Sequence, residues 1–205
     1  MVKLPEKTVE RLSNYRRLLM RYQYLEKPYI FSRDLASLLK INPVHVRRDL
    51  MLIGVSGSHS KGYELRHLIN QISQKLECNS GKNACIIGFS HAGRAILDIL
   101  SLGNVPLNVK AIFDTSAKSI NNTFNNVPCY SLEQIAAVVE KESITLAILS
   151  DMEEDPENYV ALIGALGIKG IMNLTSTPLR LPDNIHLEEF DFVTSLIKLA
   201  YFSEE

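Results

Sequence analysis

The stretch CIIGFSHAGRAILDI (residues 85–99) decides the fold of the second half of this 205-residue chain. An apolar segment at 84–87 leads into Gly88, and an amphipathic helix follows from about His91. A strand, a glycine-rich turn and a helix in this order are typical of a dinucleotide-binding unit, whose turn reads G-x-G-x-x-G. In this chain Ser90 stands where the second glycine is expected.

Strands and helices alternate through the rest of this half. Strands are predicted at 109–113, 128–130, 144–149 and 170–174, and helices at 91–102, 132–141 and 156–166. The repeated βαβ order predicts an α/β fold with a parallel, doubly wound Rossmann sheet. Asp114 ends the second strand, where a carboxylate binds the ribose hydroxyls of NAD and repels the extra phosphate of NADP. The predicted nucleotide-binding residues are Gly88, Phe89, Ser90, His91, Ala92, Gly93 and Asp114.

Charge divides the chain into two parts. Residues 1–77 hold 14 lysines and arginines against 7 acidic residues, whereas 78–205 hold 8 against 16. The balances of +7 and −8 suggest two domains with different partners, and they make the basic domain the candidate for binding a polyanion. A polar, turn-rich linker lies at 77–83. We therefore predict domains at 1–77 and 84–192, followed by a C-terminal helical segment at 193–205.

The basic domain has the pattern of a helix-turn-helix. Amphipathic helices are predicted at 8–27, 33–39, 43–53 and 65–76, with Ser32 as the N-cap of the second. Before the third helix, Asn42 is a good N-cap, and Pro43 suits the first helical position because its missing N–H costs nothing there. In this arrangement the helix after the turn enters the major groove, where arginine binds O6 and N7 of guanine.

A glycine- and serine-rich segment at 54–63 predicts a two-stranded wing, whose tip carries His59 and Lys61. The predicted DNA contacts are Ser32, His45, Arg47, Arg48, His59, Lys61 and Tyr63. The alternative is a three-helix bundle with a solvated basic face and a flexible loop.

Several motifs together resemble the Rex family of bacterial redox-sensing repressors over essentially the whole chain. They are LPEKTVERLSNY (4–15), VRRDL (46–50), the glycines at 54, 57 and 62, IFD (112–114), VPCYSL (127–132), GIKGIMN (167–173) and FDF (190–192). The resemblance implies a homodimer in which the last helix swaps onto the partner subunit. It also implies NAD(H) between the Rossmann domains, release from operator DNA when NADH binds, and a switch involving Arg17, Asp191 and Phe192.

The chain departs from the family pattern at several positions that face ligands. Ser90 crowds the approach of the backbone to pyrophosphate, so weakened nucleotide binding is expected. Asp151 lies in a segment where the family tends to have Thr-Val-Pro, and we hypothesise that its carboxylate favours NAD⁺ over NADH or rejects both. Ile99 replaces a tyrosine that couples the cofactor site to the DNA-binding domains, and His59 replaces an arginine of the wing.

Composition limits the other possibilities. No apolar run approaches the roughly 20 residues of a membrane span, and no signal peptide is recognisable, which predicts a cytoplasmic protein. The three cysteines (Cys78, Cys85 and Cys129) lack C-x-x-C spacing, so reduced thiols and no metal site are expected. The five histidines show no acid–base grouping, which makes an NAD- or CoA-dependent enzyme the weaker reading. A Rex-like protein with little or no NAD(H) response, and a ligand-blind scaffold that only dimerises, stay open as alternatives.

Overall fold

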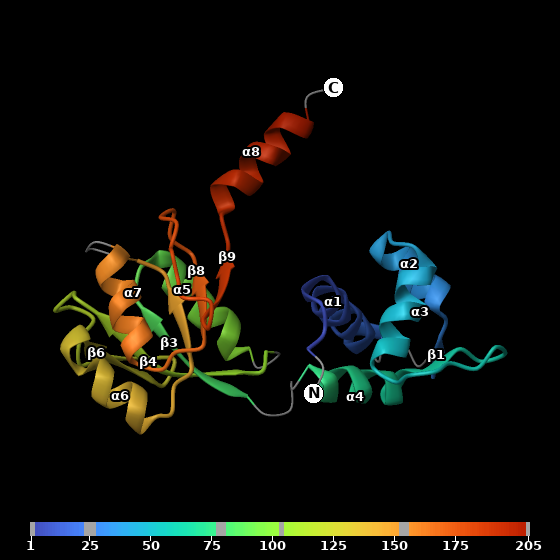
Figure 1. Ribbon diagram of the computed structural model, residues 1–205, viewed down its shortest axis with the longest axis horizontal. Coiled ribbons are helices and arrows are strands. Elements are labelled where there is room, and N and C mark those ends of the chain that lie inside the picture. Colours follow the sequence, from blue (N-terminus) through green and yellow to red (C-terminus); the bar gives the residue numbers. More distant parts are fainter. Residues whose placement is uncertain (1–2, 23–27, 77–80, 103–104, 152–155, 204–205) are drawn as a thin grey trace. The chain divides into compact units, whose positions relative to one another are not determined.

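The computed structural model describes residues 3–22, 28–76, 81–102, 105–151 and 156–203 (Figure 1). The chain forms two compact units, Met1–Ser80 and Gly81–Glu205, and each has its own hydrophobic core. The end of the first predicted helix (23–27) and most of the predicted linker, including Cys78, lie outside the described residues.

The first unit is a helical domain closed by a short antiparallel ladder. Its elements are α1 (Glu6–Tyr22), β1 (Tyr29–Ile30), α2 (Ser32–Leu39), α3 (Pro43–Leu52), β2 (Tyr63–Glu64) and α4 (Leu65–Lys75). Helix α1 packs against α4, and α2 packs against α3. The Arg16 guanidinium also ties α1 to α4, because its Nε donates to Ser73 Oγ over 2.8 Å. The predicted helices of this domain are confirmed within the described residues.

The turn between α2 and α3 follows from local chemistry. Lys40 adopts a left-handed conformation (φ 53°) that ends α2. Asn42 caps α3, since its side chain accepts from Val44 N at 2.8 Å, and Pro43 takes the first helical position, as predicted. The predicted cap of α2 was wrong by one residue. Phe31 is the N-cap, and its amide donates to the Asp34 carboxylate at 3.1 Å, so Ser32 is already helical.

The segment predicted as a two-stranded wing is less regular than expected. Among the described residues of 54–63, only one β-bridge forms, between Ser58 and Gly62. Strand β2, which follows the loop, pairs instead with β1, a segment that precedes α2 in the sequence. Gly62 is required where the loop passes close to β1, because its φ is +75° and a Cβ there would lie 2.5 Å from the Ile30 carbonyl oxygen.

The second unit is built around a seven-stranded sheet of described residues, with the order β5-β6-β4-β3-β7-β8-β9. Its elements are β3 (Lys82–Ile87), α5 (His91–Ser101), β4 (Leu107–Asp114), β5 (Thr123–Phe124), β6 (Val127–Ser131), the 3₁₀-helix η2 (Leu132–Gln134), α6 (Ile135–Lys141), β7 (Leu146–Leu149), α7 (Pro156–Ala165), β8 (Gly170–Asn173), β9 (His186–Glu189) and α8 (Phe192–Phe202). All neighbouring strands are parallel except β5 and β6. The predicted α/β fold is confirmed; β5 and β9 were not predicted.

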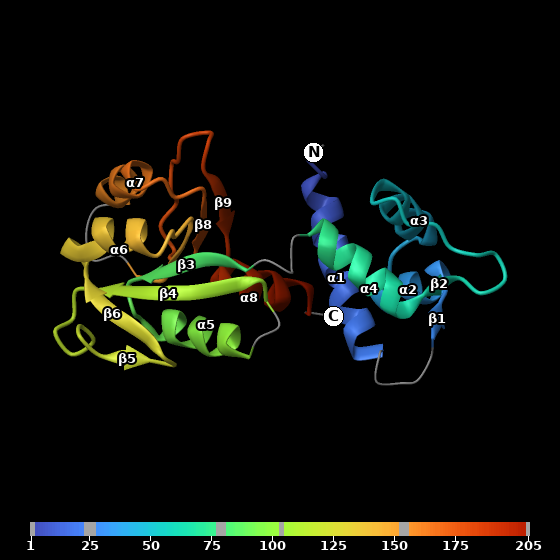
Figure 2. The ribbon, with the colours of Figure 1, turned by 90° about the horizontal axis from the view of Figure 1, so that it is seen from below.

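Alternation along the central strand β3 separates two layers of core. Cys85 and Ile87 belong to the cluster that includes buried residues of α6 and α7, whereas Ile86 belongs to the cluster that includes Leu97 of α5. Figure 2 shows the corresponding layers, with α5 on one side of the sheet and α6 and α7 on the other. Such burial on both faces explains why the strands read as continuous apolar runs.

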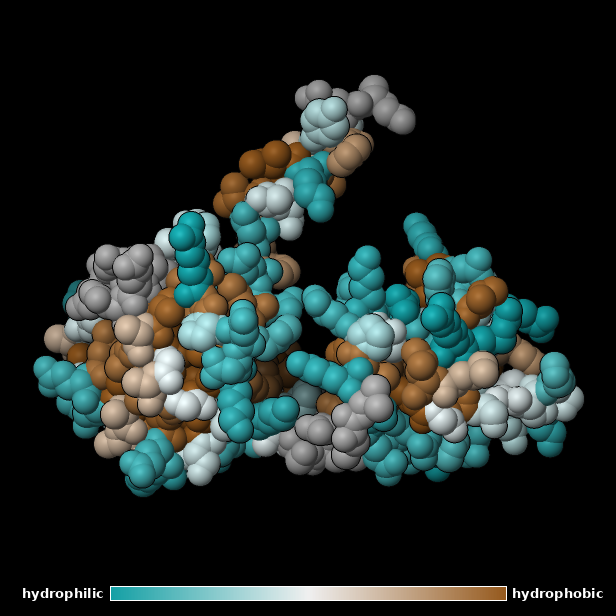
Figure 3. Space-filling model, viewed as in Figure 1, coloured by the Kyte–Doolittle hydropathy of each residue, from teal (hydrophilic) through white to brown (hydrophobic). Residues whose placement is uncertain are grey.

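The last helix, α8, buries none of its residues in the single chain. Leu196 and Ile197 are each 63% exposed, and Figure 3 shows apolar side chains along this helix. Asp191 is its N-cap and accepts from the amides of Val193 (2.9 Å) and Thr194 (3.1 Å). Across the described residues, no helix is both long enough and apolar enough to cross a membrane.

Candidate functional site

Three parallel strands of the second unit end at the same edge of the sheet. Gly88 follows β3, Asp114 ends β4, and Ser150 follows β7. Because the sheet order is β4-β3-β7, the chain changes direction across β3 at this edge. Open α/β sheets bind their ligands at such a switch point.

The glycine-rich turn is packed against the end of β7. Gly88 has a φ of +73°, and a Cβ there would overlap the backbone of Asp151. A Cβ on Gly93 would overlap the Ser150 hydroxyl. Both glycines are therefore required for the close approach of the two segments, as the motif predicts.

Ser90 uses the space that a second glycine would leave open. Its Oγ donates to the Ser150 carbonyl oxygen at 2.9 Å and accepts from Gly93 N at 3.4 Å, so it caps α5. The Ser150 hydroxyl donates in turn to the Gly88 carbonyl oxygen. Two serine hydroxyls thus tie the turn to the end of β7. The sequence placed Ser150 at the end of a strand that faces the cofactor, but it did not predict the contact with Ser90.

The turn still offers donors for an anion. The amides of His91 and Ala92, in the first turn of α5, make no hydrogen bond with other residues of the described ranges. Free amides at the start of a helix, together with the helix dipole, favour a phosphate group. The geometry therefore fits a nucleotide phosphate.

Asp114 lies beside the turn. It lines a small cavity of about 10 Å³ together with Gly88 and Asp151, and its carboxylate accepts from Thr115 N at 2.9 Å. Phe89 points elsewhere, because its ring is buried and packs 4.6 Å from that of Phe124 in the core. The structure thus brings most of the predicted nucleotide-binding residues together but assigns the side chain of Phe89 to the core.

The described residues hold no group of three or more histidine, cysteine or acidic side chains that could bind a metal ion. Cys85 and Cys129 are buried free thiols. Burial raises the pKa of Cys85 to about 12, and burial together with the negative charge of Asp114 raises the pKa of Cys129 to about 11. Such thiols are unreactive packing residues.

In the first unit, α3 presents His45, Arg47 and Arg48 to solvent. The two arginines make no hydrogen bond or ion pair with the rest of the described chain. His59 and Lys61 are exposed on the loop before β2, where the Lys61 ammonium lies 5.9 Å from the centre of the Tyr29 ring. Ser32 and Tyr63 are half-buried, so they offer less surface than the other predicted contacts.

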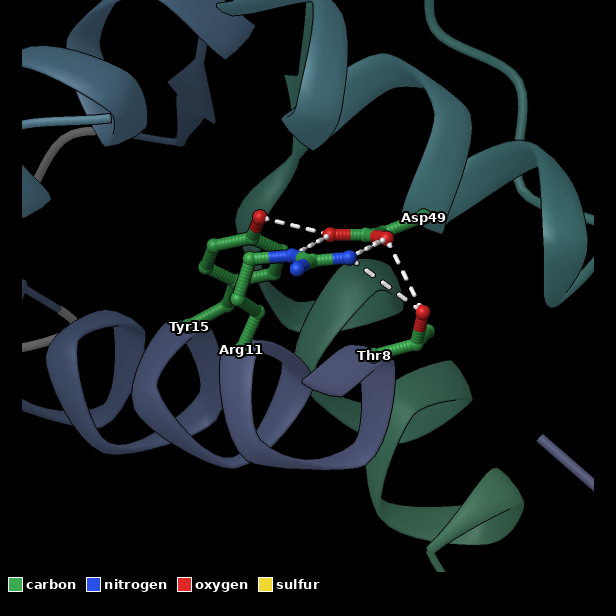
Figure 4. A network of polar contacts seen from close by, with 4 residues as sticks. All are labelled: Thr8, Arg11, Tyr15 and Asp49. Atoms are coloured by element: carbon green, nitrogen blue, oxygen red, sulfur yellow. Dashed lines mark hydrogen bonds and ion pairs between the residues drawn. The ribbon is translucent and has the colours of Figure 1, made fainter. Parts of the chain in front are cut away.

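A buried carboxylate holds α3 on α1 (Figure 4). Asp49 is 1% exposed and accepts from Arg11 Nε and Nη2, both at 2.7 Å. It also accepts from the Tyr15 hydroxyl at 2.8 Å and from the Thr8 hydroxyl at 3.4 Å. Since the partners lie at three positions on α1 and all meet the one carboxylate of Asp49, the network holds the inner side of α3 against α1 at this point.

The network also sets the charge states of its members. Burial opposes ionisation of Asp49, but the hydrogen bonds from Arg11 and Tyr15 outweigh it and hold the pKa of Asp49 below its usual value. Burial, followed by the hydrogen bond to Asp49, raises the pKa of Tyr15. The sequence contained a signal for this network, because Asp49 stands on the apolar side of its helix, between Val46 and Leu50.

Comparison with known proteins agrees with both halves of this description. Residues 3–50 match a family model described as "Putative DNA-binding protein N-terminus", and residues 79–177 match one described as "CoA binding domain". The redox-sensing transcriptional repressor Rex of Latilactobacillus sakei subsp. sakei is 32% identical over 203 residues, which cover 98% of this chain and 97% of the relative. The chain belongs to the Rex family.

Other Rex proteins give the same result. That of Bacillus licheniformis is 28% identical over 200 residues, which cover 98% of this chain and 93% of the relative. The crystal structure of RSP, a Rex-family repressor, matches with a TM-score of 0.87 at 25% identity, covering 98% of this chain and 95% of RSP. RSP in complex with β-NAD⁺ and operator DNA matches with a TM-score of 0.90 at 25% identity, covering 98% and 93%. These relatives are named as transcriptional repressors, which favours a regulator over the enzyme considered above.

The residues of the predicted Rex switch lie in different units. Arg17 is exposed on α1, where its Nη2 donates to Asn14 Oδ1 at 2.9 Å. Asp191 caps α8, and a hydrogen bond from the Thr194 hydroxyl holds the pKa of Asp191 below its usual value. Phe192 begins α8, and its ring lies edge-on to that of Phe190 at 4.5 Å between ring centres. Ile99 is 54% exposed on α5. The switch that the family resemblance implies for Arg17, Asp191 and Phe192 stays a prediction.

Proposed function

We propose that this chain is a transcriptional repressor of the Rex type that binds operator DNA as a homodimer and responds to NAD(H). The observation that carries the proposal is the recognition helix α3, whose arginines are exposed to solvent while Asp49 anchors its inner side. Arginines on the outer face of the second helix of a helix-turn-helix bind guanine in the major groove.

The exposed α8 supports dimerisation. A helix that leaves several large apolar side chains exposed in the monomer is expected to bury them against another molecule. The family resemblance implies that this molecule is a second copy of this chain. Two-fold symmetry of such a dimer predicts an operator with an inverted repeat.

The glycine-rich turn supports the response to a nucleotide. The free amides of His91 and Ala92 are suited to the pyrophosphate of NAD(H), and Asp114 is suited to a ribose hydroxyl of the same cofactor. NADH binding would then release the repressor, if NADH prefers the arrangement of the dimer that does not fit DNA. Ser90 is expected to weaken this response because it crowds the phosphate position.

The experiment is selection of bound duplexes from a random pool, followed by titration of the selected duplex with the full-length protein. An inverted repeat bound at nanomolar to micromolar concentration is expected. The double variant R47A/R48A should weaken binding at least a hundredfold, since each bidentate arginine contact contributes about 1–3 kcal/mol. R66A, which removes an exposed arginine on α4, is the matched control and should change binding little. Equal binding by the wild type and R47A/R48A would contradict the proposal.

A further inference from the structure

Helix α3 has an outer apolar side that its core packing does not explain. Val44, Met51 and Leu52 are 56%, 73% and 50% exposed, whereas the apolar residues that α3 buries are Val46 and Leu50. The exposed residues share a stripe with the outward arginines, because positions 44, 47, 48, 51 and 52 follow the spacing of one helix face. These five residues form one open surface on this side of α3.

The position of Val44 along α3 indicates which part of the DNA its side chain contacts. It is the second residue of α3, directly after Pro43, and Asn42 fixes this end by accepting from its amide. In a helix-turn-helix the first residues of the recognition helix contact base edges. Met51 lies seven residues further on, about 10 Å along the axis, at the end that is directed away from those first contacts.

The chemistry of the stripe narrows the ligand further. Arg47 and Arg48, one turn after Val44, direct this face to a polyanion, and the unit that carries it is strongly basic. The apolar group that base pairs present in the major groove is the 5-methyl of thymine. An apolar side chain on the same helix face as two arginines, at the end of the helix that meets base edges, is therefore complementary to a thymine next to the contacted guanine.

We propose that Val44 contacts the 5-methyl group of one thymine in each operator half-site and thereby specifies that base pair. This inference rests on the proposed DNA-binding function. It assigns Val44 a contribution to sequence preference, whereas Arg47 and Arg48 contribute both affinity and preference.

The test replaces thymines of the selected duplex, one symmetric pair at a time, by deoxyuridine, which lacks only the methyl group. For the wild type, one pair should weaken binding about fourfold per half-site, as expected for one buried methyl-sized group. In V44A the same replacement should have no further effect, because the contact is already lost. The control M51A truncates an exposed apolar residue at the other end of the stripe and should keep the full deoxyuridine effect.

Two further readouts separate the possible outcomes. V44A removes no charge, so the salt dependence of binding should equal that of the wild type. Val44 is exposed, so V44A should also unfold at the same temperature as the wild type. Equal deoxyuridine effects in the wild type and V44A, or an effect lost in M51A instead, would overturn the role of Val44 while leaving DNA binding intact. A wild-type chain that binds no duplex would overturn the proposed function as well.

Discussion

The recognition helix and the glycine-rich turn differ in where their polar groups are satisfied. Helix α3 is held from behind, since Asp49 on its inner side accepts four hydrogen bonds from α1 while Arg47 and Arg48 face solvent. In the glycine-rich turn, the hydroxyls of Ser90 and Ser150 instead make hydrogen bonds with the backbone of the turn and of the end of β7. The first site leaves its arginines exposed to solvent, whereas in the second the hydroxyls of the turn are already hydrogen-bonded within the chain.

The largest effect should come from removing the anchor of α3. D49A leaves the guanidinium of Arg11 and the buried hydroxyl of Tyr15 without their acceptor, so we expect a loss of about 3–5 kcal/mol of stability in the first unit. Because the chain has two units, hydrogen exchange of peptides from residues 3–22 and 28–76 is the suitable measurement.

The control for D49A is R33A, which breaks an exposed ion pair with Asp34 at 3.8 Å. A loss of at most about 1 kcal/mol is expected for such a surface pair. If the amide hydrogens of the first unit exchange at the same rate in D49A and R33A, the network does not hold α3.

In the glycine-rich turn, by contrast, a substitution should improve function, because removing the Ser90 side chain should strengthen nucleotide binding. S90G removes both the hydroxyl and the Cβ, and NADH is expected to bind about tenfold more tightly, since one hydrogen bond is typically worth about 1 kcal/mol and space is added. S90A removes the hydroxyl alone and should give a smaller gain, of about fivefold. Titration of NADH fluorescence measures both variants.

S101A is the matched control for these variants, because Ser101 lies at the far end of α5, where its hydroxyl donates to the Leu97 carbonyl oxygen. NADH should bind S101A as it binds the wild type. Weaker binding by S90G would mean that Ser90 helps to hold the phosphate.

The contrast between the two sites also explains what the sequence could predict. The cap at Asn42 depends on neighbours within a few residues, and the turn at Gly88 carries a local glycine spacing between a strand and a helix, so both were predicted from the sequence. The pairing of β1 with β2 and the Asp49 network join positions more than 30 residues apart, for which one sequence carries only weak signals. The contact between Ser150 and Ser90 was missed for the same reason, since the two side chains meet only when β7 is placed beside β3.

The anchor predicts how the stability of the first unit depends on pH. The pKa of folded Asp49 is lowered, so its stabilisation is complete above the usual aspartate pKa of about 4 and is lost as the pH falls through the folded value. The pKa of folded Tyr15 is raised, so its stabilisation is complete below pH 10 and is lost as the pH rises from there. The free energy of unfolding of the first unit is measured against pH for the wild type, D49N and Y15F. The difference between the wild type and D49N should decrease in acid, and the difference between the wild type and Y15F should decrease in alkali. Flat difference curves would exclude the network as the cause.

The smallest effect compares the two helix caps. N42A removes an acceptor for Val44 N and should destabilise the first unit by about 1 kcal/mol. S90G should cost only a few tenths of a kcal/mol in the second unit, because glycine is a tolerated N-cap. Hydrogen exchange, measured at increasing temperature for peptides of each unit, gives the loss of stability in both variants. A larger loss for S90G than for N42A would show that the Ser90 hydroxyl is needed for the fold.

The recognition helix is open to its partner, whereas the hydroxyls of the glycine-rich turn are hydrogen-bonded within the chain. The most direct test of this contrast measures the release of labelled operator DNA by NADH and compares the wild type with S90G. We predict that both proteins bind the DNA equally without nucleotide, and that S90G releases it at about tenfold lower NADH concentration. Release of both at the same NADH concentration, or a change in DNA affinity without nucleotide, would contradict the account.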